Sequence, residues 1–206
     1  RDGNNYFAIS NVPETFTYGA TTYNKGASVV HTLRGYMGDE LFFSCVTSFL
    51  NAHKFQPINA AMLRDYLSDC SGINLNDFFT DWVYQPGSLA FEIEDIGNTK
   101  GLTSSICIGQ KKSNANTFAN NVPIVVSFFN KFTNELVDTV HINMSGNQMM
   151  FDGLYVTEYY DYLYAVLDYE NKLNDAVTSD ELYIKSAGTY NMPNGLMDFE
   201  ITFMSF

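Results

Sequence analysis

Histidine, cysteine and carboxylate side chains are the groups best suited to holding a metal ion, and this chain carries few of them at useful spacing. Its three histidines, His31, His53 and His141, are far apart, and none has a second histidine or a cysteine at ligand spacing. The helical His-Glu-x-x-His motif, whose two histidines bind zinc from one helix face, is absent from the sequence. We therefore expect no complete zinc site from this chain alone.

The cysteines give no metal signal either. Cys45, Cys70 and Cys107 are widely separated, odd in number and without Cys-x-x-Cys spacing. At most one internal disulfide could form. We expect three buried thiols that behave as small apolar side chains.

Nucleophile and phosphate motifs are missing: the sequence has no Gly-x-Ser-x-Gly, Gly-x-Gly-x-x-Gly or P-loop. Two carboxylate pairs remain. Asp77 and Asp81 lie one turn apart on an expected helix, where we expect both to be solvated. Asp168 and Glu170 could hold calcium, but the glycine-punctuated spacing of a calcium loop is absent, which favours an ordinary acidic loop.

The expected secondary structure changes from helix to strand near Pro86-Gly87. Before this point apolar residues recur at helical spacing in four stretches: 29–33, 41–50, 62–67 and 75–82. Gly38-Asp39 separates the first two stretches. Asn59 can cap the third helix and Gly72 can end it, while Asn74 can cap the last.

The last helix predicts the contact between the two parts of the chain. Phe78, Phe79 and Trp82 fall on its apolar face. An amphipathic helix has to cover a surface, and the following strands are the nearest one. We therefore expect these three side chains to be buried.

After residue 88 the apolar period falls to two, and β-branched and aromatic residues dominate. The expected strands are 89–95, 105–109, 123–129, 136–142, 147–151, 162–168, 181–186 and 197–205. Residues 110–121 are the most loop-like segment. The sequence predicts an α+β chain of two domains. Residues 1–88 would form a bundle of short helices, and residues 89–206 an antiparallel, immunoglobulin- or fibronectin-like β-sandwich.

Composition excludes several classes of protein. Hydrophobic residues make up 46% of the chain and charged residues 17%, which is enough apolar material for a core. Lys plus Arg is 11 and Asp plus Glu is 23, so the formal charge is −12 and nucleic acid is a poor partner. No apolar run approaches the ~20 residues of a transmembrane helix.

One ordered series of short motifs carries the functional signal. It begins with Tyr23-Asn24-Lys25-Gly26-Ala27 and continues through Gly38-Asp39-Glu40-Leu41-Phe42. It then runs from Ser71 to Val83 and ends at Pro86-Gly87. Over about residues 15–92 this series resembles the end of the catalytic domain in the aminopeptidase N family of gluzincin zinc metallopeptidases. Gln110 is similar to a glutamine of the family's following β-sandwich.

The resemblance implies roles for two tyrosines. Tyr23 falls on the family's transition-state tyrosine, whose phenol donates to the carbonyl oxygen that becomes negative beside zinc. Tyr18 matches a second tyrosine near the site in some members. Lys25 and Gly26 match the motif, and we expect them to serve helix packing.

The resemblance also places the remaining machinery elsewhere. The family's zinc ligands, base glutamate and amine-binding motif lie upstream of this segment and are absent here. The start at Arg1, in what would be the middle of a domain, favours a C-terminal fragment that is inactive alone. The intact parent would use zinc to hydrolyse peptides from their N-terminus, with the peptide substrate and the chain's own N-terminal half as partners.

Two readings from another functional class stay open. The parent could be a zinc-free pseudopeptidase used for assembly, or the sandwich could bind a protein or a carbohydrate. A carbohydrate platform could use Tyr155, Tyr159, Tyr160, Tyr162 and Tyr164, although such spacing more often marks alternating faces of a strand. Whether the parent is an enzyme is therefore left open. The compartment is also open, with an extracytoplasmic parent as one alternative.

Overall fold

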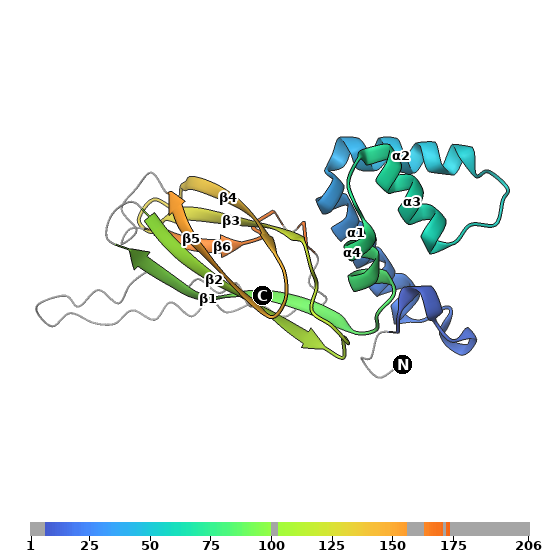
Figure 1. The fold of residues 1–206 in the computed structure, drawn as a ribbon, viewed down its shortest axis with the longest axis horizontal. Coiled ribbons are helices and arrows are strands. Elements are labelled where there is room, and N and C mark those ends of the chain that lie inside the picture. The colour runs from blue at the N-terminus through green and yellow to red at the C-terminus, as the bar shows by residue number, and fades with distance from the viewer. Residues whose placement is uncertain (1–6, 100–102, 156–162, 171, 174–206) are drawn as a thin grey trace, which may run out of the picture.

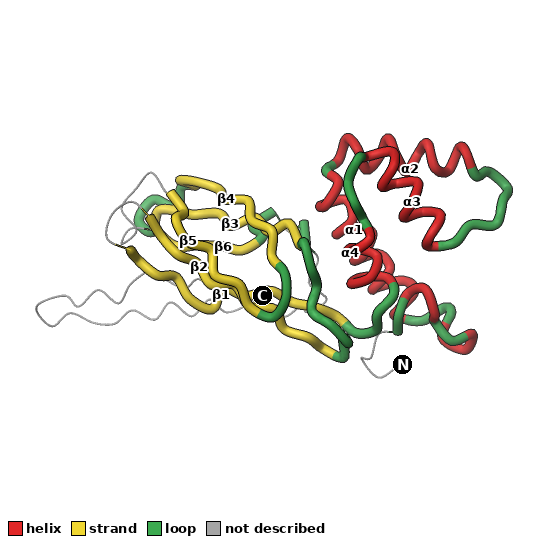
Figure 2. The backbone as a smooth tube through the Cα atoms, in the orientation of Figure 1, coloured by secondary structure: helices red, strands yellow, loops and turns green. Residues whose placement is uncertain are grey.

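The computed structural model describes residues 7–99, 103–155, 163–170 and 172–173. Helices occupy the N-terminal part of the chain and strands follow it (Figure 1). In Figure 2 the helices gather at one end of the molecule and the strands at the other. The predicted α+β class is confirmed. The strand candidates 181–186 and 197–205 lie outside the described residues.

The helical part consists of short elements, as the four apolar stretches predict. They are η1 (Ile9–Asn11), η2 (Glu14–Phe16), η3 (Thr21–Lys25), α1 (Gly26–Met37), α2 (Asp39–Ala52), α3 (Ala60–Ser71), α4 (Asn76–Phe78) and η4 (Phe79–Val83). The first two are 3₁₀ turns, whereas η3 and η4 are single π-helical turns. Among the described residues, no helix is both long and apolar enough to cross a membrane.

Local capping signals set the ends of α3. The Asn59 side chain accepts a hydrogen bond from the Met62 N–H at 2.9 Å. Gly72 ends the helix in the left-handed region at φ 72°, where glycine is favoured. Both predicted caps are confirmed. Asn74 instead accepts from the Asn76 N–H at 3.0 Å, and α4 begins only at Asn76.

The expectation of three free thiols is wrong for two of them. Cys45 of α2 and Cys70 of α3 form a disulfide with a Cα–Cα distance of 5.8 Å, and Cys107 is free and buried. The two partners are 25 residues apart in sequence. Their approach follows from the packing of α2 on α3, which spacing alone does not reveal.

Removing this cross-link should destabilise the folded chain. For a loop of about 25 residues, the chain-entropy relation gives roughly 3.5 kcal/mol at 25 °C. We expect a reducing agent to lower the urea midpoint of the unmodified chain. The variant Cys45→Ala/Cys70→Ser should start at the lower midpoint and show no response to reductant. If the urea midpoint of the unmodified chain stays the same when reductant is added, the result would contradict the disulfide.

Within the described residues, the strands form two antiparallel sheets of three strands each. The first sheet has the order β1 (Ser88–Thr99), β2 (Thr103–Ser113), β5 (Gln148–Tyr155). The second has the order β4 (Leu136–Met144), β3 (Val122–Asn130), β6 (Leu163–Leu167). The predicted loop 110–121 is wrong in its first four residues, because 110–113 extend β2 and pair with 88–91 of β1.

Among the residues that the structure describes, one hydrophobic core runs from the helices into the sandwich. Phe78, Phe79 and Trp82 are 2%, 2% and 5% exposed, which confirms their predicted burial. The Trp82 ring lies 6.5 Å from the Phe91 ring of β1, measured between centroids. The last helical turns therefore pack directly on the sandwich.

Gly87 makes the turn between the two parts. Its φ of +74° lies in the region that favours glycine. A Cβ at this position would collide with the backbone of Ser113, Asn114 and Ala115. The chain can therefore approach the sandwich this closely only with glycine at the turn.

Candidate active site

Tyr23 lies in the π-helical turn η3, directly before α1. Its N–H donates to the Gly19 carbonyl at 3.3 Å, which fixes the backbone of the turn. The side chain is 58% exposed. Within the described part of the chain, no hydrogen bond occupies its hydroxyl. The phenol is thus held on an ordered turn with its donor free.

Tyr18 lies in the turn before η3 and is more exposed, at 86%. No hydrogen bond or ring contact joins it to Tyr23 among the described residues. The structure therefore places both predicted tyrosines at the start of the helical part without bringing their side chains into contact.

Lys25 is the buried end of the same turn and is only 5% exposed. Its Nζ donates to the carbonyl of Phe7 at 3.2 Å and to that of Gln85 at 2.8 Å. Burial lowers the pKa of Lys25 to about 8. Thr21, at the other end of η3, accepts from the Phe7 N–H at 3.0 Å. Both ends of the turn are thus bonded to distant backbone.

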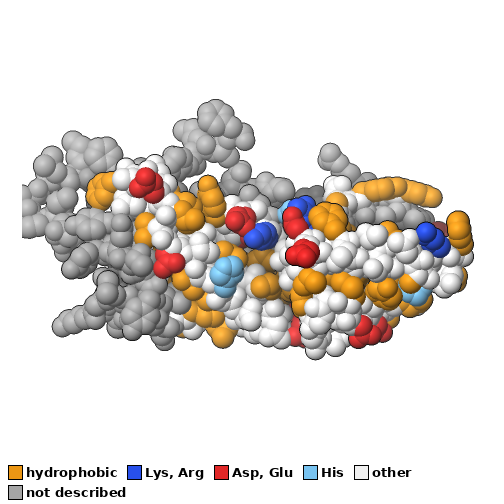
Figure 3. All heavy atoms as spheres, turned by 90° about the horizontal axis from the view of Figure 1, so that it is seen from above, with side chains coloured by type: hydrophobic (Ala, Val, Ile, Leu, Met, Phe, Trp, Pro, Cys, Tyr) orange, Lys and Arg blue, Asp and Glu red, His pale blue; other side chains and the backbone are white. Residues whose placement is uncertain are grey.

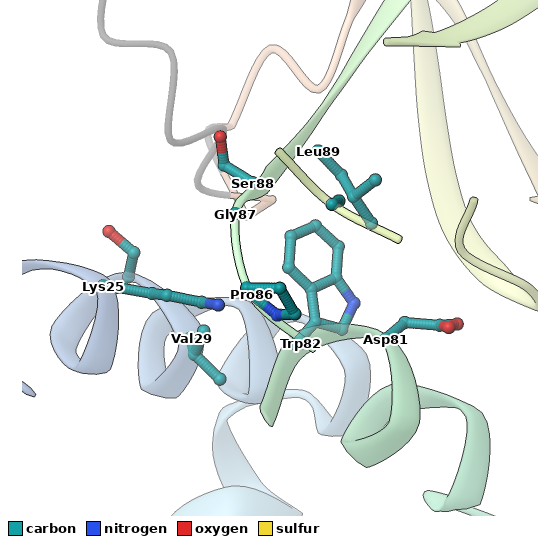
Figure 4. A pocket seen from close by; sticks show the side chains of 10 residues that line it. Lys25, Val29, Asp81, Trp82, Pro86, Gly87, Ser88 and Leu89 are labelled. Atoms are coloured by element: carbon teal, nitrogen blue, oxygen red, sulfur yellow. The ribbon is translucent and has the colours of Figure 1, made fainter. Parts of the chain in front are cut away.

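A crevice separates α1 from the turn into the sandwich, and Figure 4 shows it from close by. Its lining residues are Lys25, Ser28, Val29, Asp81, Trp82, Pro86, Gly87, Ser88, Leu89 and Ala115. The Lys25 amino group points toward Pro86, and Asp81 lies on the other side of Trp82 (Figure 4). The two ionisable groups of the crevice therefore form no acid–base pair.

Asp81 is buried, at 4% exposed, so the expected solvated pair with Asp77 is wrong. Its carboxylate accepts from the Asn120 N–H at 2.8 Å, and burial raises its pKa to about 6. Asp77 accepts from the side-chain amide of Asn121. The physical reason for both contacts is that the loop 114–121 of the sandwich covers this helix face.

Gln85 completes the polar contact with that loop. Its Oε1 accepts from the N–H groups of Asn116 and Thr117 at 3.1 and 3.0 Å and from the Thr117 hydroxyl at 3.2 Å. Its Nε2 donates to the Asp81 carbonyl at 2.7 Å. The motifs of the sequence do not predict this role, although a polar residue at every fourth position from Asp77 through Asp81 to Gln85 marks this helix face.

Gln110 of β2 holds the same loop from the sandwich side. Its Nε2 donates to the Ala119 carbonyl at 2.8 Å, and its Oε1 accepts from the Ala119 N–H at 2.9 Å. Gln110 itself is only 5% exposed. Two buried glutamines therefore fix the loop, Gln85 from the helices and Gln110 from the strands.

The second carboxylate pair serves the backbone and a neighbouring lysine. Asp168 accepts from the N–H groups of Lys172 and Leu173 at 2.9 and 2.6 Å, and Glu170 forms an ion pair with Lys172. Across the described ranges, no group of three or more His, Cys, Asp or Glu could hold a metal ion. Of the five tyrosines proposed as a carbohydrate platform, Tyr159, Tyr160 and Tyr162 lie outside the described residues.

The turn that carries Tyr23 and the helices behind it correspond to a known family. A family model described as the peptidase family M1 domain matches residues 7–82. This stretch runs from the segment bonded to η3 through Trp82. The helical part of the chain is therefore similar to the peptidase family M1 domain.

Several proteins that are similar to this chain are named aminopeptidases. Probable aminopeptidase 1 of Saccharolobus solfataricus is 26% identical over 207 aligned positions, covering 88% of this chain and 26% of the relative. Aminopeptidase N of Lactococcus lactis is 30% identical over 80 residues, covering 39% of this chain and 9% of the relative. The chain thus spans about a quarter, or less, of the length of these relatives.

A solved structure shares the fold over most of this chain. Aminopeptidase A of Legionella pneumophila, in complex with aspartic acid, matches with a TM-score of 0.55 and 14% identity. The match covers 81% of this chain and 19% of that protein. The predicted resemblance to M1 aminopeptidases is confirmed, whereas the roles of Tyr23 and Tyr18 stay predictions.

Proposed function

We propose that this segment is the C-terminal part of a zinc-dependent aminopeptidase, which hydrolyses peptides from their N-terminus. It would comprise the end of the catalytic domain and the sandwich that follows. The observation that carries the proposal is the match of the M1 domain model to residues 7–82, with Tyr23 exposed on an ordered turn inside that match. Single π-helical turns are also frequent at functional sites.

Tyr23 is proposed as the residue of this segment that acts on the substrate. Attack on a peptide carbonyl places negative charge on its oxygen, and a phenol remains a hydrogen-bond donor at neutral pH. The exposed side chain and the unoccupied hydroxyl fit a donor that finds its acceptor only when substrate is bound. Tyr18, 86% exposed, is the weaker candidate for a second contact.

Zinc would supply the Lewis acid for the hydrolysis in the intact protein. The described residues do not fit a zinc site, because none of them form a group of three or more ligands. We therefore assign the metal and the general base to the part of the parent upstream of this segment. We expect this segment to be inactive alone.

The exposed surface of the helical part supports the proposal that another part of the parent packs against it. Figure 3 shows hydrophobic side chains spread over the helical end of the molecule. The exposed apolar residues of α1, α2 and the loop after α2 are Val30, Leu41, Phe43, Leu50, Phe55 and Ile58. Large exposed apolar patches are typical of interaction sites. We propose the N-terminal half of the parent as the partner that covers it.

Assay of the full-length protein tests this function. We expect hydrolysis of an aminoacyl-p-nitroanilide, loss of activity on treatment with 1,10-phenanthroline, and recovery on adding zinc. An N-acetylated form of the same substrate is the control and should not be cleaved. If the zinc-loaded protein leaves both substrates intact, the non-catalytic alternative, a pseudopeptidase or binding module, takes the place of this proposal. Hydrolysis by residues 1–206 alone would contradict the division of the machinery.

A further inference from the structure

Lys25 is bonded in a way that ordinary helix packing does not require. Among the described residues no carboxylate pairs with its ammonium, although the side chain is 5% exposed. A buried ammonium is costly unless hydrogen bonds satisfy it. Here the two bonds go to the backbone carbonyls of Phe7 and Gln85, which are 18 and 60 residues away in sequence. The lysine thus joins three separate segments at one atom.

Gln85, whose carbonyl accepts from Lys25, is itself held in place by hydrogen bonds of its side chain. The Gln85 side chain is bonded to Asn116 and Thr117 of the sandwich loop and to the Asp81 carbonyl of the last helix. A bond from Lys25 to this residue therefore ties η3 to the junction between helices and sandwich. Figure 4 shows the amino group directed at that junction, beside Pro86.

We propose that Lys25 is a positioning residue for Tyr23, and this proposal rests on the aminopeptidase function proposed above. Lys25 follows Tyr23 by two residues in a turn of only five residues, so the lysine and the tyrosine share one rigid unit. The bonds of Lys25 and of Thr21 hold the two ends of that unit. A shift of ~1 Å in a catalytic group can cost ~100-fold in rate.

Lys25→Met tests the proposal in the full-length protein, because methionine keeps the unbranched chain and removes the donors. We expect kcat to fall by about 10- to 100-fold with little change in KM, since the tyrosine contact strengthens as charge develops. Lys111→Met is the matched control: Lys111 is exposed on β2 of the sandwich, where it forms a surface ion pair with Glu92, and its loss should leave kcat unchanged.

A double-mutant cycle separates positioning from a general loss of structure. If Lys25 acts through Tyr23, then Lys25→Met should lower kcat by less than about 2-fold in the Tyr23→Phe background, where the donor is already gone. If the two losses multiply in full, Lys25 acts independently of Tyr23 and the proposal is overturned.

The role of Tyr23 and the role of Lys25 predict different outcomes for the two variants. If Tyr23→Phe alone leaves turnover unchanged, the role of Tyr23 in the proposed function falls, and positioning falls with it. If Tyr23→Phe lowers turnover but Lys25→Met does not, only positioning falls. Should Lys25→Met unfold, Lys25→Gln, which keeps an amide donor, takes its place in the same cycle. If both variants unfold, Lys25 serves stability and the proposal is wrong.

Discussion

Tyr23→Phe is expected to lower kcat of the full-length protein by about 100- to 1,000-fold, equivalent to roughly 3–4 kcal/mol of transition-state stabilisation. The substitution removes one hydroxyl and keeps the ring. The lost hydrogen bond strengthens as the substrate oxygen becomes negative, so KM should move little. Steady-state kinetics on an aminoacyl-p-nitroanilide measures both constants.

Melting temperature on the same variant separates this role from a structural one. The Tyr23 hydroxyl has no partner among the described residues, so its loss should barely change stability. Tyr84→Phe is the control: Tyr84 is 36% exposed in the same helical part, and its variant should keep normal turnover. Normal turnover in Tyr23→Phe would remove Tyr23 from the site and leave only the similarity to the family.

Trp82→Ala should destabilise the chain by about 3–5 kcal/mol, the range for truncating a large buried aromatic residue. The indole packs between the rings of Phe78 and Phe91, with centroid distances of 6.4 and 6.5 Å. Its Nε1 donates to the Tyr36 hydroxyl at 3.4 Å. Truncation removes these contacts together and leaves a cavity at the junction. Urea unfolding of residues 1–206 measures the loss.

Phe43→Ala provides the comparison for Trp82, because it truncates an aromatic ring that is 54% exposed. We expect this control to cost less than about 1 kcal/mol in the isolated chain. A loss for Trp82→Ala that is as small as the loss for Phe43→Ala would show that Trp82 does not fill the junction in solution.

Sequence reasoning succeeded where the cause of a structure is local. Asn59 and Gly72 act on residues within one turn, so their types alone predict both ends of α3. It failed where the cause is a distant segment. The pairing of Cys45 with Cys70 depends on how α2 packs against α3. The burial of Asp81 depends on a loop that lies 39 residues further along the chain.

In the candidate site, too, the sequence predicts the features with local causes and not the contacts between distant segments. The order and spacing of short motifs predict a role for Tyr23, and the structure places its side chain on an exposed turn. The partners of Lys25 could not be predicted, because Phe7 and Gln85 reach it only through the folded arrangement of three segments. The periodicity that places Lys25 beside a helix does not show which carbonyls its amino group meets.

The continuous core has a consequence for how the chain holds together. The domain boundary that we propose near residue 88 marks a change of secondary structure, yet one apolar cluster extends across it from Val29 and Leu33 to Ile93 and Ile124. Each part uses the other to cover its own apolar surface. We infer that the helices and the sandwich form one cooperative unit, so neither is an interchangeable module that could be moved to another protein by itself.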